Sequence, residues 1–526
     1  MTILRAWLYT AAADLRARLR DRRLLMMVAA CIYIGHLVLT GQIELTLADR
    51  SHRGVENAAW MGTMLALTAA FLLTFFGFYL VRGALARDRQ ARTAPLVASA
   101  PVRSVTFLLG KWASGTLFLL LLAGSMALSL AVLFVLRGNG LPAPGPLLTP
   151  FFLFVVPTAT AVTALALAFE CLPGLRGTVG GILYFMGAMA AVTAPLSGSP
   201  PVDLLGMGTI HNSMAQALLE QYPEADIGTM FSFGYYRDAA EQLKTFRWDG
   251  VAPTARLVAH RAGLILGSAV LVAGAALPFS RFDPSPAWWA QMGTGLPDPN
   301  EDASNATGTA PSSTPTASPA PSTADSSPRS ASLGRFSAAR SLRPLRLFLA
   351  EGRRALRRRS WTWKLGALGL VGAGLWWPTS TGLLVVAWLW PMPLWSDLGV
   401  RETVCRVAPL VATSVYPRAQ RVAAWAVGAA TAVALVIGPV LLGGQWAALV
   451  GVLFVPALGL AAGRLSGTPR LFEVVYLVLW YVGLANQQAV LDFGGVAQAS
   501  AATLLGYGLL TAGLLAGAVT NRYQKH

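Results

Sequence analysis

Apolar residues occur along this chain in long continuous runs, which short polar segments separate. A run of roughly 17–25 residues is long enough to cross a bilayer as an α-helix. The runs do not alternate between apolar and polar positions, which favours helices over a transmembrane barrel. We predict spans at about 24–41, 59–82, 105–136, 148–172, 177–197 and 258–280, and at about 361–376, 380–396, 421–443, 446–463, 472–489 and 498–519. The pattern predicts an all-α, polytopic membrane protein with about twelve transmembrane helices.

Two basic segments with apolar residues at helical spacing come before the first and the seventh span. In residues 3–23 the apolar side holds Leu4, Leu8, Leu15 and Leu19. The second segment holds Leu345, Phe348, Leu349, Leu356, Arg353, Arg354, Arg357, Arg358 and Arg359. Asp14, Arg16, Leu19 and Arg20 match Glu351, Arg353, Leu356 and Arg357, 337 residues later (14 to 351). Such segments suit amphipathic helices at the membrane interface, although residues 3–23 could instead be a basic flank of the first span.

Residues 283–334 differ from the rest because they are dense in Pro, Ser, Thr and Ala. A segment of this composition cannot bury a core, so we expect a disordered linker. The linker divides the chain into a first transmembrane half, 1–282, and a second transmembrane half, 335–526. Each half then holds six predicted spans, and the longest polar segment of the first half, 198–257, is expected outside with room for short helices.

One sequence motif occurs once in each half. Arg87-Asp88-Arg89-Gln90-Ala91-Arg92-Thr93-Ala94-Pro95-Leu96-Val97-Ala98 resembles Arg401-Glu402-Thr403-Val404-Cys405-Arg406-Val407-Ala408-Pro409-Leu410-Val411-Ala412. The separation is constant at 314 residues, from 87 to 401 and from 98 to 412. Each copy lies between two predicted spans and continues to a proline and an arginine: Pro101 and Arg103 in one, Pro417 and Arg418 in the other. We interpret the repeat as an internal duplication of a six-helix unit with one functional loop kept in each copy. Ordinary basic loops are the alternative.

The positive charge of the chain indicates which ends of the spans face the cytoplasm. The formal net charge is +17, and arginines gather before the first span, in the repeated loops and after the linker. Lys and Arg collect in cytoplasmic loops of membrane proteins, so the charge is better explained by this rule than by nucleic acid. Six spans per half then place both termini, the linker and both repeated loops in the cytoplasm.

Composition and motifs exclude several kinds of chemistry. Of 526 residues, 55% are hydrophobic and only 12% are charged, against about 25% charged in soluble proteins. The three cysteines, Cys31, Cys171 and Cys405, share no metal-type spacing, so we expect neither a disulfide nor a metal site. The chain has no phosphate-binding G-x-x-x-x-G-K-[ST] loop, no His-Glu-x-x-His and no Gly-x-Ser-x-Gly elbow.

Few acids lie in the predicted spans. Glu170 and Glu473 are expected near cytoplasmic span ends and Asp492 near an outside end. An ion-coupled carrier normally needs charges near the middle of the bilayer, and a membrane-embedded transferase needs acids or histidines clustered at one face. The pattern therefore favours a membrane protein that is not itself an enzyme and has no cofactor of its own.

At this point the sequence resembles a known family. The residues that carry the resemblance are Arg87-Asp88, Pro101, Leu109-Gly110-Lys111, the segment 3–23, Phe246-Arg247-Trp248-Asp249-Gly250, Arg261 and Arg281-Phe282-Asp283-Pro284. They look like the permease subunits of type-2 ATP-binding-cassette exporters, in which an amphipathic elbow helix comes before span one and a coupling helix between spans two and three docks onto the ATPase. The second half departs from the pattern, because Gly110-Lys111 has no clear equivalent there and its outer loops are short.

The resemblance implies a multidrug-type exporter of the bacterial cytoplasmic membrane, with two fused six-helix halves. It would move an amphipathic or hydrophobic drug, antibiotic or lipid outward, and two separate ATPase subunits would bind the ATP and Mg. The residues expected to couple to the ATPases are Arg87, Asp88, Arg92, Pro95, Pro101, Arg103, Arg401, Glu402, Arg406, Pro409, Pro417 and Arg418. The alternatives are an ion-coupled secondary transporter and a membrane-embedded lipid-linked transferase.

Overall fold

The computed structural model describes most of both predicted halves. The described residues are 3–21, 23–47, 52–90, 94–99, 102–136, 143–172, 174–193, 203–225, 232–235, 244–279, 343–357, 359–404, 417–497 and 499–520. The predicted linker 283–334 lies outside this set, as do four of the predicted coupling residues, namely Arg92, Pro101, Arg406 and Pro409.

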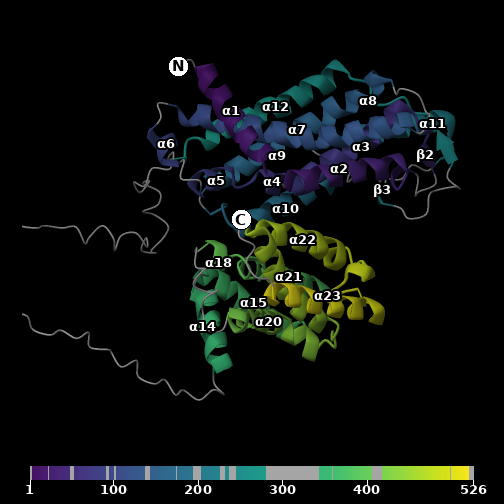
Figure 1. The fold of residues 1–526 in the computed structure, drawn as a ribbon. Helices are drawn as coiled ribbons and strands as arrows, with labels where there is room; N and C mark the ends of the chain where they lie inside the picture. Colours follow the sequence, from purple (N-terminus) through teal and green to yellow (C-terminus); the bar gives the residue numbers. More distant parts are fainter. Residues whose placement is uncertain are drawn as a thin grey trace, which may run out of the picture.

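The first half is a bundle of helices around a long central helix, α7 (Figure 1). Its elements are α1 (Ile3–Leu19), α2 (Arg23–Leu39), α3 (Ala58–Leu72), the π-helical turn η1 (Leu73–Gly77), α4 (Phe78–Val81), α5 (Ala84–Gln90), α6 (Ala94–Ser99), α7 (Ser104–Leu136), α8 (Pro144–Pro150), η2 (Phe151–Val155), α9 (Val156–Cys171), α10 (Thr178–Thr193), α11 (Met207–Gln221) and α12 (Ala255–Ala275). At 33 residues, α7 is about 50 Å long, more than the apolar thickness of a bilayer. Both α1 and α2 pack on α7, and α9 packs on α12.

The second half is a smaller bundle with similar packing partners. Its elements are α14 (Arg343–Arg357), α15 (Trp361–Trp376), α16 (Thr381–Leu389), α17 (Met392–Ser396), α18 (Arg401–Val404), α20 (Pro417–Leu441), α21 (Ala448–Ser466), α22 (Arg470–Leu479), the π-helical turn η5 (Trp480–Ala485), the short 3-10 helix η6 (Ala489–Leu491) and α23 (Ala501–Thr520). Both α14 and α15 pack on α20, and α21 packs on α23. Serine side chains start two of these helices, since Ser360 and Ser380 each accept a hydrogen bond from a backbone N–H in the first turn.

The bundle contains the long apolar helices expected of a multi-pass membrane protein. In the part of the chain that the structure describes, eight helices are long and apolar enough to cross a membrane, or up to nine if α1 and α2, which meet at an 80° bend, count as one. Helices occupy all twelve predicted ranges, but several, such as α10 with 16 residues, fall short of the span length. Twelve spans in two six-helix repeats therefore stay a prediction.

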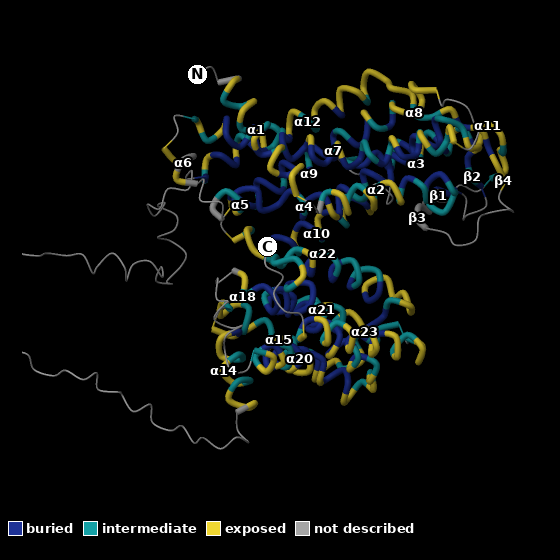
Figure 2. The backbone as a smooth tube through the Cα atoms, in the orientation of Figure 1, coloured by how far each residue is buried: buried dark blue, intermediate teal, exposed yellow. Residues whose placement is uncertain are grey.

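Some of the apolar helices are buried inside the bundle and others are exposed on its outside, as expected for a protein in a membrane. Figure 2 shows α3, α4 and α9 mostly buried, whereas α12 and α23 expose much of their apolar surface. The most apolar stretches of α12 and α23 are only 17% buried. A helix that is apolar on a solvent-accessible face is stable where that face meets lipid.

A small cap at one end of the first half combines two segments that lie far apart in the sequence. Strand β1 (Ile43–Thr46) pairs antiparallel with β3 (Ser232–Tyr235), and β2 (His52–Gly54) pairs parallel with β4 (Lys244–Phe246). In Figure 1 the cap, with α11, lies at the end opposite α5 and α6. The pKa of His52 is lowered mainly by its burial and secondly by the positive charge of Lys244. The sequence predicted short helices in this region but not its strands, which are only three or four residues long.

The cap is fastened to the bundle by aromatic side chains. The indole of Trp60, at the start of α3, meets the rings of Phe246 and Trp248 edge to face. The Asn57 side chain accepts a hydrogen bond from the backbone N–H of Trp60 and donates one to the backbone carbonyl of Trp248, at 2.8 and 2.7 Å. The residues that begin α3 therefore also hold the returning chain before α12.

Candidate functional site

The described members of the predicted coupling set lie at one end of each bundle. Arg87 and Asp88 belong to α5, Pro95 to α6, Arg401 and Glu402 to α18, and Pro417 and Arg418 to the start of α20, while Arg103 comes just before α7. Figure 1 shows α5, α6, α14 and α18 at the same end of the molecule. Pro95, Arg103 and Arg418 are exposed, whereas Arg401 and Glu402 are half-buried.

Asp88 is part of a buried ion cluster that joins three helices. The cluster, called here the Asp14 cluster, consists of Asp14, Arg18, Asp88, Lys111 and Ser114. The Lys111 ammonium donates to Asp14 at 2.7 Å and to Asp88 at 2.9 Å. Asp14 also accepts from the Arg18 Nε and the Ser114 hydroxyl, both at 2.7 Å. One lysine on α7 therefore holds the carboxylates of α1 and α5 together.

Burial makes the Asp14 cluster energetically important. The side chains of Asp14, Arg18 and Lys111 are 4 to 6% exposed. Removing one partner of a buried ion pair costs about 3–5 kcal/mol because the remaining charge is left without compensation. The cluster should thus couple the positions of α1, α5 and α7, so that none of them shifts without breaking a hydrogen-bonded ion pair.

The second half carries a related cluster, called here the Glu402 cluster, which consists of Glu351, Arg401, Glu402, Arg421 and Arg464. Glu351 on α14 binds Arg401 on α18 at 3.2 Å. Glu402 on α18 binds Arg421 on α20 at 3.4 Å and Arg464 on α21 at 3.3 Å. These side chains are 8 to 20% exposed. The second cluster therefore joins α14, α18, α20 and α21, with longer contacts and more exposure than the first.

The two clusters include side chains that were not among the predicted coupling residues. Asp14 and Glu351 had been matched only as parts of two amphipathic segments, and both prove to bind residues of the predicted loop region or its neighbouring helix. Lys111 and Arg421 have equivalent positions in the two halves. Each lies on the helix that follows the repeated loop, and each forms an ion pair with the acid of that loop, Asp88 or Glu402. The available signal was a cationic residue at position 111, within the predicted span 105–136, and another at position 421, the first residue of the predicted span 421–443.

A further set of buried polar contacts holds the start of α5. The Glu170 carboxylate, at the end of α9, accepts hydrogen bonds from the backbone N–H groups of Ala84 and Leu85, at 3.1 and 2.9 Å. Those N–H groups belong to the first turn of α5, where a carboxylate is a favourable cap. The chain can turn into α5 because Gly83 adopts a positive φ of 86°.

The same turn forms part of the contact between the halves. Arg82 donates from Nη2 to the carbonyls of Leu175, Arg176 and Gly177. Its Nη1 lies 3.7 Å from the carboxylate of Glu473 on α22, and both side chains are at most 5% exposed. Thr178 and Ser396 share a hydrogen bond across the same interface. The halves thus meet through polar groups, of which the Arg82–Glu473 pair is buried.

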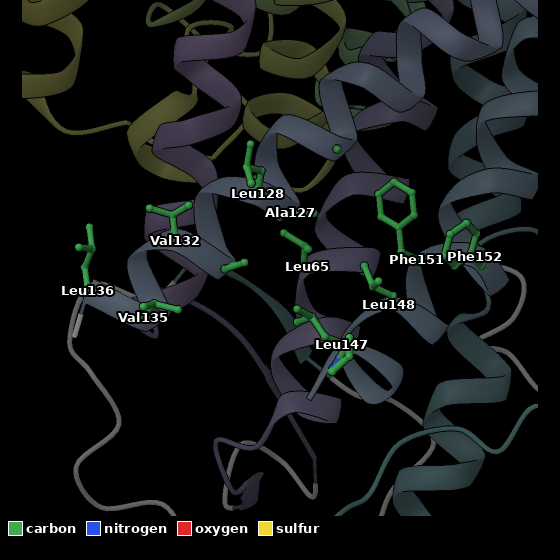
Figure 3. A pocket seen from close by; sticks show the side chains of 13 residues that line it. Leu65, Ala127, Leu128, Val132, Val135, Leu136, Leu147, Leu148, Phe151 and Phe152 are labelled. Atoms are coloured by element: carbon green, nitrogen blue, oxygen red, sulfur yellow. The ribbon is translucent and has the colours of Figure 1, made fainter. Parts of the chain in front are cut away.

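An apolar groove lies away from the ion clusters. It has a volume of about 670 Å³ and is lined by residues of α3, α7, α8 and η2, including Leu65, Leu128, Val132, Leu147 and Phe151. Figure 3 shows these side chains around the groove, which opens at the outer surface of the first half, where Leu128 and Phe152 are 66% and 64% exposed. Its lining is suited to acyl chains or other apolar molecules and offers no group for acid–base chemistry.

No metal-binding arrangement occurs among the described residues, where no group of three His, Cys, Asp or Glu side chains could hold an ion. Cys31 and Cys171 are free thiols, and Cys405 lies outside the described residues. No family model, curated protein or solved structure matches the chain. Any functional assignment therefore depends on the residues and contacts described above.

Proposed function

We propose that the chain is the membrane permease of an ATP-driven exporter, with two fused six-helix halves in a bacterial cytoplasmic membrane. It exports an amphipathic or hydrophobic drug, antibiotic or lipid, and two separate ATPase subunits supply the energy. The observation that carries the proposal is the repeated Arg-acid pair at 87–88 and 401–402, whose acid in each copy forms an ion pair with a base on the helix after the loop, Asp88 with Lys111 and Glu402 with Arg421.

The packing of the two bundles supports the duplication. In each half the basic helix and the helix after it pack on the helix that follows the repeated loop: α1 and α2 on α7, α14 and α15 on α20. In each half the last predicted span packs on the predicted span two before it, α12 on α9 and α23 on α21. Equal neighbours at equal places in the chain order are expected of two copies of one unit.

The clusters suggest how motion would pass from an ATPase to the bundle. An ATPase that pushes on α5 and α6 moves Asp88, and Lys111 and Asp14 oblige α7 and α1 to follow. In the second half, α18 moves α20 and α21 through Glu402. Rigid-body movement of packed helices is a common form of such transitions. The tighter first cluster fits stronger coupling in that half.

The apolar groove suggests where a hydrophobic substrate would be taken up. It opens at an exposed apolar surface of the first half, which in this proposal faces lipid, and it is lined by α7, the helix that also carries Lys111. A molecule dissolved in the bilayer could enter it without crossing an aqueous phase. The Asp14 cluster and the groove would then both involve α7. A movement of α7 driven by the ATPase would therefore change the groove that holds the substrate.

The proposal is tested by reconstitution with an ATPase encoded beside the chain. Inverted vesicles that hold both proteins should accumulate a panel of hydrophobic fluorescent dyes only when ATP is present. The same vesicles without the ATPase, or with an ATPase that binds but cannot hydrolyse ATP, are the controls. Hydrolysis of ATP by the chain alone, or accumulation without ATP, would refute the exporter reading.

One observation favours an ion-coupled transporter as a second candidate. Glu473 is 2% exposed and lies at the contact between the halves, 3.7 Å from Arg82. A buried acid facing a base between two bundles is a typical proton-coupling arrangement. Dye accumulation that an imposed pH gradient drives in the absence of any ATPase, and that Glu473→Gln abolishes, would select this candidate.

A further inference from the structure

One face of helix α14 is exposed and does not pack against the rest of the described bundle. One side of the helix packs on α20, where Ala355 is 1% exposed and Gly352 faces Val427. Glu351 lies on the packed side and is bound by Arg354 and Arg401, at 3.1 and 3.2 Å. The only acid of the helix is thus already neutralised, and the rest of the helix surface is left apolar or basic.

The exposed part of α14 divides into two parallel stripes. Leu345, Leu349 and Leu356 form the first, and they are 52, 48 and 45% exposed. Arg346, Arg353 and Arg357 form the second, and all three are exposed. Each set follows helical spacing, and at 100° per residue the basic stripe lies beside the apolar one. Among the residues that the structure describes, no acid pairs with these three arginines.

Two stripes of this kind match the boundary of an anionic membrane. Leucines that lie among acyl chains bring neighbouring guanidinium groups to the level of the phosphates, and long arginine side chains reach the interface readily. A neutral headgroup offers no net charge to three unpaired cations, whereas an anionic phospholipid complements them. A soluble acidic partner would match the arginines but would leave the three leucines facing water.

We propose that the exposed face of α14 is a binding surface for anionic phospholipid in the bilayer. The apolar stripe inserts among acyl chains and the basic stripe binds the phosphates of adjacent headgroups. The lipid would hold α14 in place, and through Glu351 and Arg401 it would also hold α18. The proposal does not depend on the exporter function, since it concerns only this helix and the lipid around it.

The test follows hydrogen exchange of the full chain in nanodiscs of phosphatidylcholine, with and without phosphatidylglycerol. Backbone amides of residues 343–357 should exchange more slowly when phosphatidylglycerol is present, and high salt should remove the difference. The triple variant Arg346→Gln, Arg353→Gln, Arg357→Gln should lose the effect, with at least about a tenfold loss of relative affinity for phosphatidylglycerol. Because these side chains are exposed, the variant should fold.

Two matched variants separate the parts of the surface. Lys244→Gln, Arg247→Gln, Arg256→Gln removes the same charge from exposed positions at or near the cap, and should keep the lipid effect. Leu349→Ser, Leu356→Ser should weaken protection of α14 in both lipids. Equal protection in both lipids for the unmodified chain would overturn the proposal. Protection that appears only with an added ATPase, or only at high protein concentration, would assign this face to that partner or to a second copy and would overturn it as well.

Discussion

At the scale of single residues, the unusual feature is a small number of charges buried near the ends of apolar helices. Lys111 lies within an apolar run, where an unpaired cation would be costly. Two carboxylates offset that cost by accepting hydrogen bonds from the Lys111 ammonium, and Ser114 in turn donates to one of them, Asp14. Position 111 therefore needs a cation of suitable length, and its partners must remain ionised.

Replacing Lys111 by Met should destabilise the protein by about 3–5 kcal/mol, because Asp88 and part of the Asp14 charge lose their partner. Asp88→Asn should cost less, since the Asp88 side chain is 17% exposed. The double variant should recover part of the loss, because it also removes the uncompensated carboxylate. Thermal unfolding in detergent measures all three.

Arg421→Met supplies the comparison from the second half, whose contacts are longer and more exposed. It should destabilise the protein less than Lys111→Met does. Strictly additive effects of Lys111→Met and Asp88→Asn would show that the two side chains do not act as a pair.

At the scale of elements, the helices around the groove have positions where a larger side chain would meet no neighbouring atom. Adding a Cβ at Gly124 on α7 would meet no heavy atom within 4 Å, although this residue lines the groove. Gly267 on α12 is equally open and lies outside the groove lining. Two glycines in long helices thus differ mainly in whether they adjoin the candidate site for an apolar molecule.

Gly124→Leu should lower ATP-dependent accumulation of hydrophobic dyes several-fold, because the new side chain takes up groove volume. Gly267→Leu should leave accumulation unchanged. Both changes should slightly stabilise their helices, by up to about 1 kcal/mol, since leucine has a higher helix propensity than glycine. Equal transport by the two variants would exclude the groove as the uptake site.

At the scale of the whole molecule, the two halves are joined by contacts and not by the linker alone. Arg82 and Glu473 form a buried pair across the interface, and Phe185 meets the ring of Tyr481 at 6.2 Å between centroids. Gly83, beside Arg82, leaves room for the guanidinium of Arg470 from the other half. The interface is therefore built around the same turn that begins α5.

A protease site placed in residues 283–334 tests whether these contacts suffice. After cleavage of the folded, detergent-solubilised chain, the halves should remain together on size-exclusion chromatography. Glu473→Ala should cause them to separate, because Arg82 is left as a buried charge without its acid. Glu220→Gln, an exposed acid on α11, is the control. Separation of the unmodified halves on cleavage would contradict an interface stabilised by these contacts.

The positions of the helices and the recurring segments could be predicted from the sequence. Hydrophobic run length is a local property, so the predicted 105–136 and 361–376 agree closely with α7 and α15. The repeat at Arg87 and Arg401 was visible for the same reason, although its role in coupling stays a prediction. Whether all twelve predicted ranges cross the membrane was harder to predict. An apolar run that contains a π-helical turn or forms only a short helix can either span the bilayer or stop within it.

Which side chains contact one another could not be predicted from the sequence and is known from the folded structure. Lys111 and Asp14 are 97 residues apart in the chain, and Arg82 binds Glu473 from the other half. The strands of the cap likewise pair segments near positions 45 and 235. Such contacts depend on how far each helix is rotated and how deeply it lies beside its neighbours. Those quantities are set by the packing of whole faces, so no local pattern in the chain specifies them.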